Sequence, residues 1–313
     1  MTDRTKVLFI AGADRSGSTL LDLLLGSVNG FIAVGELSNI WQRGIIEGRL
    51  CGCGAPLPTC DVWSDVLASV FGHAPGSTDA EAVLSLRAHA TRVRHTRRIL
   101  RDERPQLGWY LAILSHLYTA IAHRTDSAVI VDSSKDPSDA AALTLTPGIE
   151  AFVVHLVRDP RGVAFSRRRR AKAQPDTSVP TRMAATSVSR ATMEWLAWNL
   201  GTELVTRSIP ERSLLVRYED FARSPEHEIA RLVRLVDGSG PSLPFVGTGE
   251  AVVDVVHTVS GNPSRFTRGA VRVSVDDEWI ARQSVSDRIV STVIASPLLA
   301  RYGYPVFDVA GGR

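Results

Sequence analysis

Short, wholly apolar runs alternate along this chain with longer segments in which apolar residues recur at helical spacing. The apolar runs occupy residues 7–11, 31–34, 128–131, 151–157 and 214–216. Strands that are apolar on both faces and separated by helices are typical of a buried parallel sheet. Residues 61–124 predict mostly helix. The pattern therefore indicates an α/β fold in which helices flank a central parallel sheet.

The length of 313 residues suits one large α/β domain with an insertion. We expect a single domain over residues 1–313, with a helical insertion at about 37–124 on the substrate side and a mobile, polar loop at about 171–187. The N-terminus enters the first strand without a signal peptide, and no apolar run approaches the roughly 18 residues that span a bilayer. We therefore expect a cytoplasmic protein with no membrane span. The net charge of +3 is too small for a general nucleic-acid binder.

The loop after the first strand resembles a phosphate-binding P-loop that lacks its lysine. It reads Gly12-Ala-Asp-Arg15-Ser-Gly17-Ser18-Thr19, so the spacing of the two glycines fits, but Ser18 stands where the P-loop pattern has lysine. Backbone N–H groups of such a loop and the start of the next helix still form a cradle for an oxyanion. Arg15 is the one cation in this stretch of sequence. The loop therefore argues against ordinary hydrolysis of ATP or GTP. It predicts a ligand with a different terminal group.

Every expected strand ends in polar or charged residues. Because ligands of parallel α/β sheets bind beyond the carboxyl ends of the strands, these residues predict one shared site. Besides the loop they are Glu36, Asp132, Ser133, Ser134, Lys135, Asp136, Arg158, Asp159, Arg217, Tyr218, Glu219 and Asp220.

Three cysteines, Cys51, Cys53 and Cys60, lie within ten residues of one another. A zinc site would need a fourth ligand, and the nearest candidate, His73, has no recognisable finger spacing. A disulfide to Cys60 is sterically conceivable, but a reducing cytosol would oppose it. We interpret the segment as a turn rich in glycine and proline with small, half-buried thiols, and we expect no metal.

Taken together, the motifs resemble those of the sulfotransferase superfamily, whose donor is 3′-phosphoadenosine-5′-phosphosulfate (PAPS). Arg15-Ser-Gly-Ser-Thr-Leu20 is similar to the family's 5′-phosphosulfate loop, and Arg158 followed eight residues later by Ser166 is similar to its 3′-phosphate motif. Further matches begin at Asp132, at Arg217 and at Ser260, the last similar to the loop that closes over the donor. The resemblance spans about residues 6–40 and 128–280.

The resemblance implies PAPS as co-substrate and assigns roles to individual residues. Glu36 would be the general base, and Arg15 and Lys135 would be cations along the path of the transferred group. The donor-binding residues would be Arg15, Ser16, Gly17, Ser18, Thr19, Leu20, Arg158, Ser166, Arg170, Tyr218, Ser260, Arg265, Arg268 and Gly269. Which of Arg265 and Arg268 contacts the donor stays open. No metal is implied.

Two features place the chain nearer to the tyrosylprotein and carbohydrate branch than to the cytosolic phenol and steroid branch. Gly35-Glu36 follows the second strand, and Lys135-Asp136-Pro137 ends the third. The resemblance therefore implies transfer of a sulfuryl group to a hydroxyl of a small-molecule, carbohydrate or lipid acceptor. The sequence does not identify the acceptor or the oligomeric state.

Other readings of the same residues lead to other functions. A small-molecule kinase with a degenerate P-loop is the main alternative, and Asp132 is its nearest candidate for a magnesium ligand. The basic stretches 87–104 and 161–172 could instead serve a protein that binds anions or nucleic acid without catalysis. Taken alone, the Glu36 carboxylate could stabilise the N-terminus of the following helix through the helix dipole. Arg158 and Asp159 could form a structural ion pair.

Overall fold

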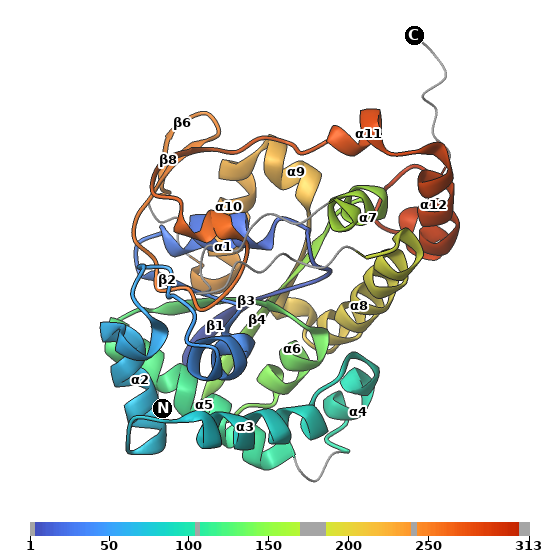
Figure 1. The fold of residues 1–313 in the computed structure, drawn as a ribbon. Coiled ribbons are helices and arrows are strands. Elements are labelled where there is room, and N and C mark those ends of the chain that lie inside the picture. The colour runs from blue at the N-terminus through green and yellow to red at the C-terminus, as the bar shows by residue number, and fades with distance from the viewer. Residues whose placement is uncertain (1–3, 104–106, 170–185, 239–242, 307–313) are drawn as a thin grey trace.

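Five parallel strands form the centre of the computed structural model, which describes residues 4–103, 107–169, 186–238 and 243–306 (Figure 1). The strand order is β2-β3-β1-β4-β5, and each neighbouring pair is parallel. The strands are β1 (Thr5–Ala11), β2 (Phe31–Gly35), β3 (Val129–Lys135), β4 (Ile149–Val157) and β5 (Ser213–Arg217). Each overlaps one of the apolar runs, so the predicted α/β fold is confirmed.

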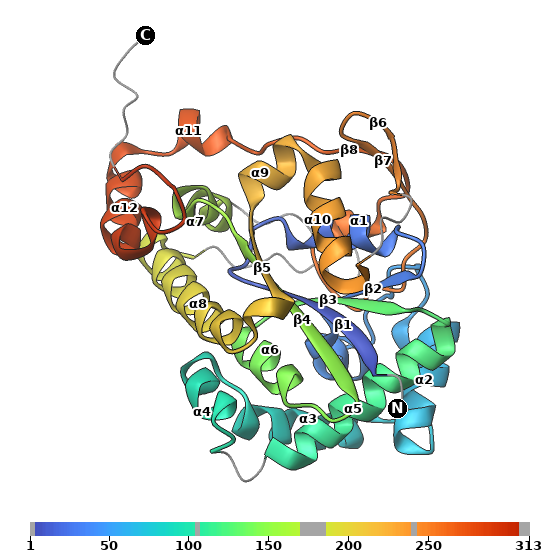
Figure 2. The same ribbon diagram turned by 180° about the vertical axis from the view of Figure 1, so that it is seen from behind.

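The side chains of β1 alternate between two hydrophobic cores, one on each face of the sheet. Val7 and Phe9 belong to the core beneath α2 (Asp61–Phe71), α3 (Ser77–Ala90), α4 (Thr96–Leu100), α5 (Leu107–Thr125) and α6 (Pro137–Thr144). Leu8 and Ile10 belong to the core beneath α1 (Ser18–Gly26), α9 (Tyr218–Arg223) and α10 (Pro225–Asp237). The two groups of helices lie on opposite sides of the sheet (Figures 1 and 2). Both faces are buried, which is why the strands lack polar alternation.

A third group of helices packs beside the end of β4. It consists of α7 (Pro160–Arg168), α8 (Val188–Ser208), α11 (Glu278–Arg282) and α12 (Val285–Leu299), and the core between α7, α8 and α12 centres on the fully buried Trp195. None of the helices in the described part of the chain has the length and apolar character needed to cross a bilayer.

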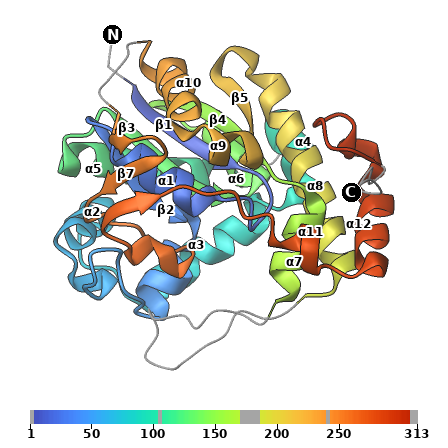
Figure 3. The ribbon, with the colours of Figure 1, turned by 90° about the horizontal axis from the view of Figure 1, so that it is seen from above.

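A small antiparallel sheet, which the sequence analysis did not predict, lies outside the main sheet. It consists of β6 (Phe245–Gly247), β7 (Glu250–Val253) and β8 (Gly269–Arg272), in the order β6-β7-β8. These strands have three or four residues and are half exposed. Runs this short carry no periodic signal. The sheet matters for function because the chain between β7 and β8 returns to the rim of the main sheet (Figure 3).

His155, in the middle of β4, makes the fold sensitive to acid. Its ring is buried, and its Nε2 lies 2.8 Å from Asn199 Oδ1. Burial lowers the pKa of His155 to about 4, below its ordinary value of 6.5. The unfolded chain therefore binds a proton between these two pH values that the folded chain does not bind. Stability is full above about pH 6.5 and falls as the pH drops toward 4, by up to about 3 kcal/mol.

This dependence is measurable by urea unfolding of the wild type, His155→Gln and the control His227→Gln, whose ring is exposed on α10. Between about pH 7.5 and 5, the free energy of unfolding of the wild type should fall by about 2 kcal/mol more than that of His155→Gln. His227→Gln should follow the wild type. Equal slopes for the wild type and His155→Gln would contradict the assignment.

Candidate active site

The loop between β1 and α1 approaches its neighbours so closely that two of its positions require glycine. A Cβ at Gly12 would lie 2.2 Å from the backbone oxygen of Leu156, and a Cβ at Gly17 would lie 2.6 Å from Cδ2 of Tyr218. Gly17 also has a φ of 90° and forms the N-cap of α1 without a capping side chain. The loop therefore presents bare backbone and the start of a helix at the carboxyl end of β1, which is the arrangement that binds oxyanions.

Both predicted cations of the site stand on strained backbone. Four described residues other than glycine have positive φ, and two of them are Arg15 (67°) and Lys135 (72°). Such conformations cost about 1–3 kcal/mol each and gather at functional sites. The backbone oxygen of Lys135 accepts a 3.1 Å hydrogen bond from Gly12 N, so the two strained segments are joined directly.

Lys135 connects the loop to Glu36. Its buried Nζ donates to Glu36 Oε1 at 2.5 Å and lies 3.4 Å from Asp14 Oδ1. Burial acts to lower the pKa of Lys135, but the Glu36 and Asp14 carboxylates outweigh it and raise the pKa above its ordinary value. Lys135 is therefore a permanent cation between the loop and the carboxylate.

The other carboxylate oxygen of Glu36 is held by a second set of donors. Asn39 Nδ2 donates to Oε2 at 2.8 Å, and Arg43 Nη1 and Ser260 Oγ each lie 3.4 Å away. Asn39 lies on the 3₁₀ helix η1 (Leu37–Asn39) and Arg43 on the following π-helix η2 (Ile40–Ile46). These contacts fix the orientation of the Glu36 side chain, which retains about 15% exposure. The carboxylate is thus held in one orientation and stays partly accessible, which are the geometric requirements of a general base.

The segment after β7 completes this side of the site (Figure 3). Ser260 O accepts from Glu36 N at 3.3 Å, and Ser260 Oγ accepts from Arg43 Nη1 at 2.6 Å. Two residues later, Asn262 N donates to Thr19 Oγ1 at 3.3 Å. The segment therefore touches both the Glu36 side chain and the start of α1.

Arg158 and Tyr218 hold the other side of the loop. Arg158 Nη1 donates to Arg15 O at 3.0 Å, and its guanidinium lies 4.4 Å from the centre of the Tyr218 ring. Tyr218 in turn packs against Gly17 and accepts from Asp276 N at 2.9 Å. Asp276 Oδ2 pairs with Arg158 Nη2 at 3.1 Å. The structure thus brings Arg158 and Tyr218, from the ends of β4 and β5, to the loop.

The alternative ion pair between Arg158 and Asp159 does not form. Asp159 caps α7 by accepting from Arg161 N at 2.9 Å, and both its oxygens accept from the buried Arg161 guanidinium. Arg158 is therefore left to face the loop.

Two buried polar atoms at the loop find no hydrogen-bond partner within the described residues, namely Ser16 Oγ and Arg158 Nε. A buried unsatisfied donor costs about 1–3 kcal/mol, so its presence calls for a reason. An anion against the backbone of the loop would give Ser16 Oγ a partner, whereas Arg158 Nε lies beside Gly162 of α7, 3.3 Å from the position of a Cβ on that glycine. The residues present therefore fit a ligand that carries phosphate or sulfate groups.

The structure places the remaining residues that the sequence predicted to bind the donor molecule as follows. Ser18 and Thr19 open α1 together with Leu20, and Ser166 lies half-buried on α7. Arg170 lies outside the described residues, as does most of the expected loop at 171–187. Arg265 donates to the backbone oxygens of Thr258 and Leu50, and Arg268 donates to Cys53 O. Gly269 begins β8 and is exposed.

Sequence reasoning missed three residues around Glu36 and Lys135, and it placed Ser134 among the strand-end residues without predicting its contact. Asp14, Asn39 and Arg43 contact these two side chains, and Ser134 Oγ accepts from Ser38 N at 2.9 Å to fix the start of η1. Asn39 and Arg43 lie three and seven residues after Glu36, at the spacing of one helix face. That spacing was a usable signal for those two, whereas the contacts of Asp14 and Ser134 depend on the sheet register.

A sequence model described as the sulfotransferase family matches residues 8–238. Among solved structures, the sulfotransferase domain from the Synechococcus PCC 7002 olefin synthase is similar, with 18% identity, a TM-score of 0.54 and coverage of 95% of this chain and 96% of that chain. The sulfotransferase domain from the curacin biosynthetic pathway has 18% identity, a TM-score of 0.49 and coverage of 96% and 99%. No curated protein matches the chain. The olefin synthase domain is similar in fold, and the family match covers most of the chain.

Proposed function

The chain belongs to the sulfotransferase family, and on that premise we propose that it transfers the sulfuryl group of PAPS to a hydroxyl of a small-molecule, carbohydrate or lipid acceptor. The observation that carries this proposal is the chain of contacts from the loop through Lys135 to Glu36. It sets an anion cradle, a permanent cation and an accessible carboxylate side by side. We also propose that residues 1–313 form one domain, with the helices of 37–124 walling the acceptor side, and that it works in the cytoplasm.

In this proposal the loop residues Arg15, Ser16, Gly17, Ser18, Thr19 and Leu20 bind the 5′-phosphosulfate end of the donor. Arg158 binds the 3′-phosphate with Ser166 and Arg170, and Tyr218 lies along the adenosine. The unsatisfied Ser16 Oγ supports the placement of an anionic group at the loop, because it is a buried hydroxyl with no partner among the described residues. Ser260, Arg265, Arg268 and Gly269 belong to the segment that covers the donor.

The donor supplies an electrophilic sulfur on a phosphate leaving group, and the chain supplies position, charge and a base. Glu36 accepts the proton of the acceptor hydroxyl as its oxygen forms the new bond to sulfur. The bond between sulfur and the phosphate oxygen breaks, and 3′,5′-ADP leaves with that electron pair. Lys135 and Arg15 stabilise the negative charge that gathers on the transferred oxygens and on the leaving phosphate.

The kinase alternative has weaker support. Its candidate magnesium ligand, Asp132, accepts from Tyr118 Oη at 2.5 Å through one oxygen and from Ser134 N at 2.7 Å through the other. Burial raises the pKa of Asp132 to about 6. Both oxygens of this buried carboxylate are already hydrogen-bonded, so Asp132 is better suited to holding Ser134 in position than to binding a metal ion.

Ligand-dependent thermal unfolding separates these functions. We expect 3′,5′-ADP, the desulfonated product of PAPS, to raise the melting temperature without magnesium. At a concentration of about 100 times Kd the gain in stability should be about 2.7 kcal/mol. Stabilisation by Mg·ATP with no effect of 3′,5′-ADP would overturn the proposal in favour of the kinase.

Gly17→Ala should remove most of the donor affinity. The new Cβ would lie 2.6 Å from the Tyr218 ring at a φ of 90°, so either the loop or the ring must move. An overpacking cost of about 1–3 kcal/mol corresponds to a rise of about 5- to 160-fold in Kd for 3′,5′-ADP, measured by calorimetry. The matched control is Gly72→Ala, also at positive φ (75°) but with nothing within 4 Å of its Cβ. An unchanged Kd for Gly17→Ala would remove the loop from the donor site.

A further inference from the structure

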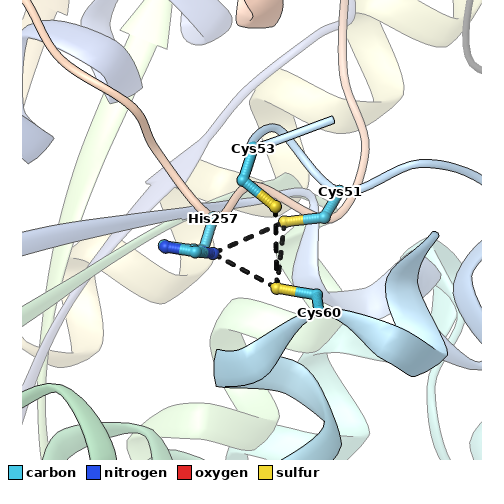
Figure 4. A group of neighbouring side chains, drawn as sticks. All are labelled: Cys51, Cys53, Cys60 and His257. Carbon is cyan, nitrogen blue, oxygen red and sulfur yellow. Dashed lines mark hydrogen bonds between the residues drawn. The ribbon is translucent and has the colours of Figure 1, made fainter. Parts of the chain in front are cut away.

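Three cysteines and one histidine from two distant segments point toward one another (Figure 4). Cys51 and Cys53 lie in the turn after η2, Cys60 precedes α2, and His257 follows β7. Their ligand atoms all lie within 4.8 Å of one another. The sequence offered only His73 as a fourth group, whereas His257 is 197 residues beyond Cys60 and was not considered. Three thiols and an imidazole are a ligand set of structural zinc sites.

The separations fit a single tetrahedral ion. Bonds of about 2.3 Å from zinc to sulfur and about 2.0 Å to nitrogen put neighbouring ligand atoms about 3.5–3.8 Å apart. Cys60 Sγ lies 3.7 Å from Cys51 Sγ and 3.8 Å from Cys53 Sγ. His257 Nδ1 lies 3.8 Å from Cys51 Sγ and 3.2 Å from Cys60 Sγ. A disulfide needs about 2.05 Å between sulfurs, and all three cysteines are free.

We propose that Cys51, Cys53, Cys60 and His257 bind one zinc ion, which fastens the segment after η2 to the segment that carries Ser260.

The surroundings of the four residues are those of a closed structural site. Cys51 and Cys60 are fully buried, and with all four residues bound a tetrahedral ion has no open position for catalysis. Cys51 N donates to Ala55 O, and Gly54 N donates to Cys51 O, each at 2.8 Å, so the turn holds its shape. Trp63 Nε1 donates to His257 O at 2.8 Å and fixes the backbone of the histidine.

Direct hydrogen bonds already join the same two segments around the cluster. Gly52 N donates to Thr258 O at 2.9 Å, and Arg265 bridges Thr258 O and Leu50 O. His257 lies three residues before Ser260, which contacts Glu36 and Arg43. Zinc would therefore hold in place the segment that positions Glu36 and reaches Thr19, without taking part in sulfuryl transfer. The proposal stands whether or not the donor is PAPS.

Metal analysis of the purified full chain tests this directly. After growth with zinc and removal of loose metal, we expect about one zinc per chain by mass spectrometry. Cobalt exchanged into the wild type should give the visible bands of a tetrahedral ion and a near-ultraviolet thiolate charge-transfer band. Cys60→Ser and His257→Gln should lose the zinc, whereas His73→Gln, whose side chain is 60% exposed, should keep it.

The cobalt spectrum uses the wild type, so it reads the site even where a variant fails to fold. Wild type with no bound zinc and no tetrahedral cobalt spectrum would overturn the proposal. So would iron in place of zinc, or a disulfide among the three cysteines in peptides mapped without reduction. Full zinc content in His257→Gln would overturn the assignment of the fourth ligand. None of these readouts depends on turnover, so they are independent of the proposed function.

Discussion

Glu36→Gln is expected to lower kcat for sulfuryl transfer by about 10²–10⁴ while leaving the binding of 3′,5′-ADP nearly unchanged. Glutamine keeps the shape of the side chain and an oxygen that can accept from Lys135 Nζ, which donates to Glu36 Oε1 at 2.5 Å. It cannot take the proton of the acceptor hydroxyl. The loss therefore belongs to the chemical step. Transfer of labelled sulfate from PAPS measures the rate, and calorimetry with 3′,5′-ADP measures the binding.

Glu211→Gln is the matched control, because Glu211 is exposed and lies just before β5, at the amino end of the strand. The site lies at the opposite, carboxyl ends of the strands. It should transfer sulfate like the wild type. Turnover of Glu36→Gln within about threefold of the wild type would remove Glu36 from the mechanism, since general-base catalysis contributes far more than that.

Lys135→Met is expected to lower kcat by a factor of about 10²–10³, the second large effect that we expect. The methionine keeps most of the apolar stem but removes the charge that lies between Glu36 and Asp14. Charge developing on the transferred group would then lose its nearest cation from β3. Affinity for 3′,5′-ADP should fall much less than kcat, because the product no longer carries the transferred group.

The matched control is Lys6→Met at the start of β1, where Nζ donates to Val236 O at 3.1 Å. Like Lys135→Met, this variant removes a lysine from a strand of the main sheet, but Lys6 lies at the amino end of β1, away from the site. It should leave kcat unchanged. An equal loss in the two variants would indicate general destabilisation, and an unchanged kcat in Lys135→Met would contradict the role assigned to this lysine.

The main sheet could be predicted from sequence because each of its strands includes an uninterrupted apolar run. A strand such as β4 is buried on both faces, and its polar residues are Glu150, next to its start, and His155. The sheet of β6, β7 and β8 could not be predicted, because its strands have only three or four residues and are too short to show a periodic pattern.

The candidate site was predictable as far as it consists of strand ends. Arg15, Lys135 and Arg158 each follow a recognisable strand, and parallel strands bring their carboxyl ends to one edge. Their individual contacts were not predictable. Lys135 follows a register shift that adds one residue to β3 opposite Phe9–Ala11 of β1, and Ser260 reaches Glu36 from a segment more than 200 residues away.

The cysteine cluster shows the same limit more sharply. Because Cys51, Cys53 and Cys60 are neighbours in sequence, their proximity in the fold could be predicted. His257 joins them because the chain between β7 and β8 folds back onto the turn after η2, and no local pattern encodes that return.

The most direct test is transfer of label from sulfur-labelled PAPS to an acceptor in a host-cell extract. The purified wild type should form a labelled, acid-stable product without added magnesium, and Glu36→Gln should form about 10²–10⁴ times less of it at equal protein. Identifying that product would also name the acceptor. A wild type that transfers no label above the Glu36→Gln control, yet transfers the terminal phosphate of ATP, would contradict the assignment as a PAPS-dependent sulfotransferase.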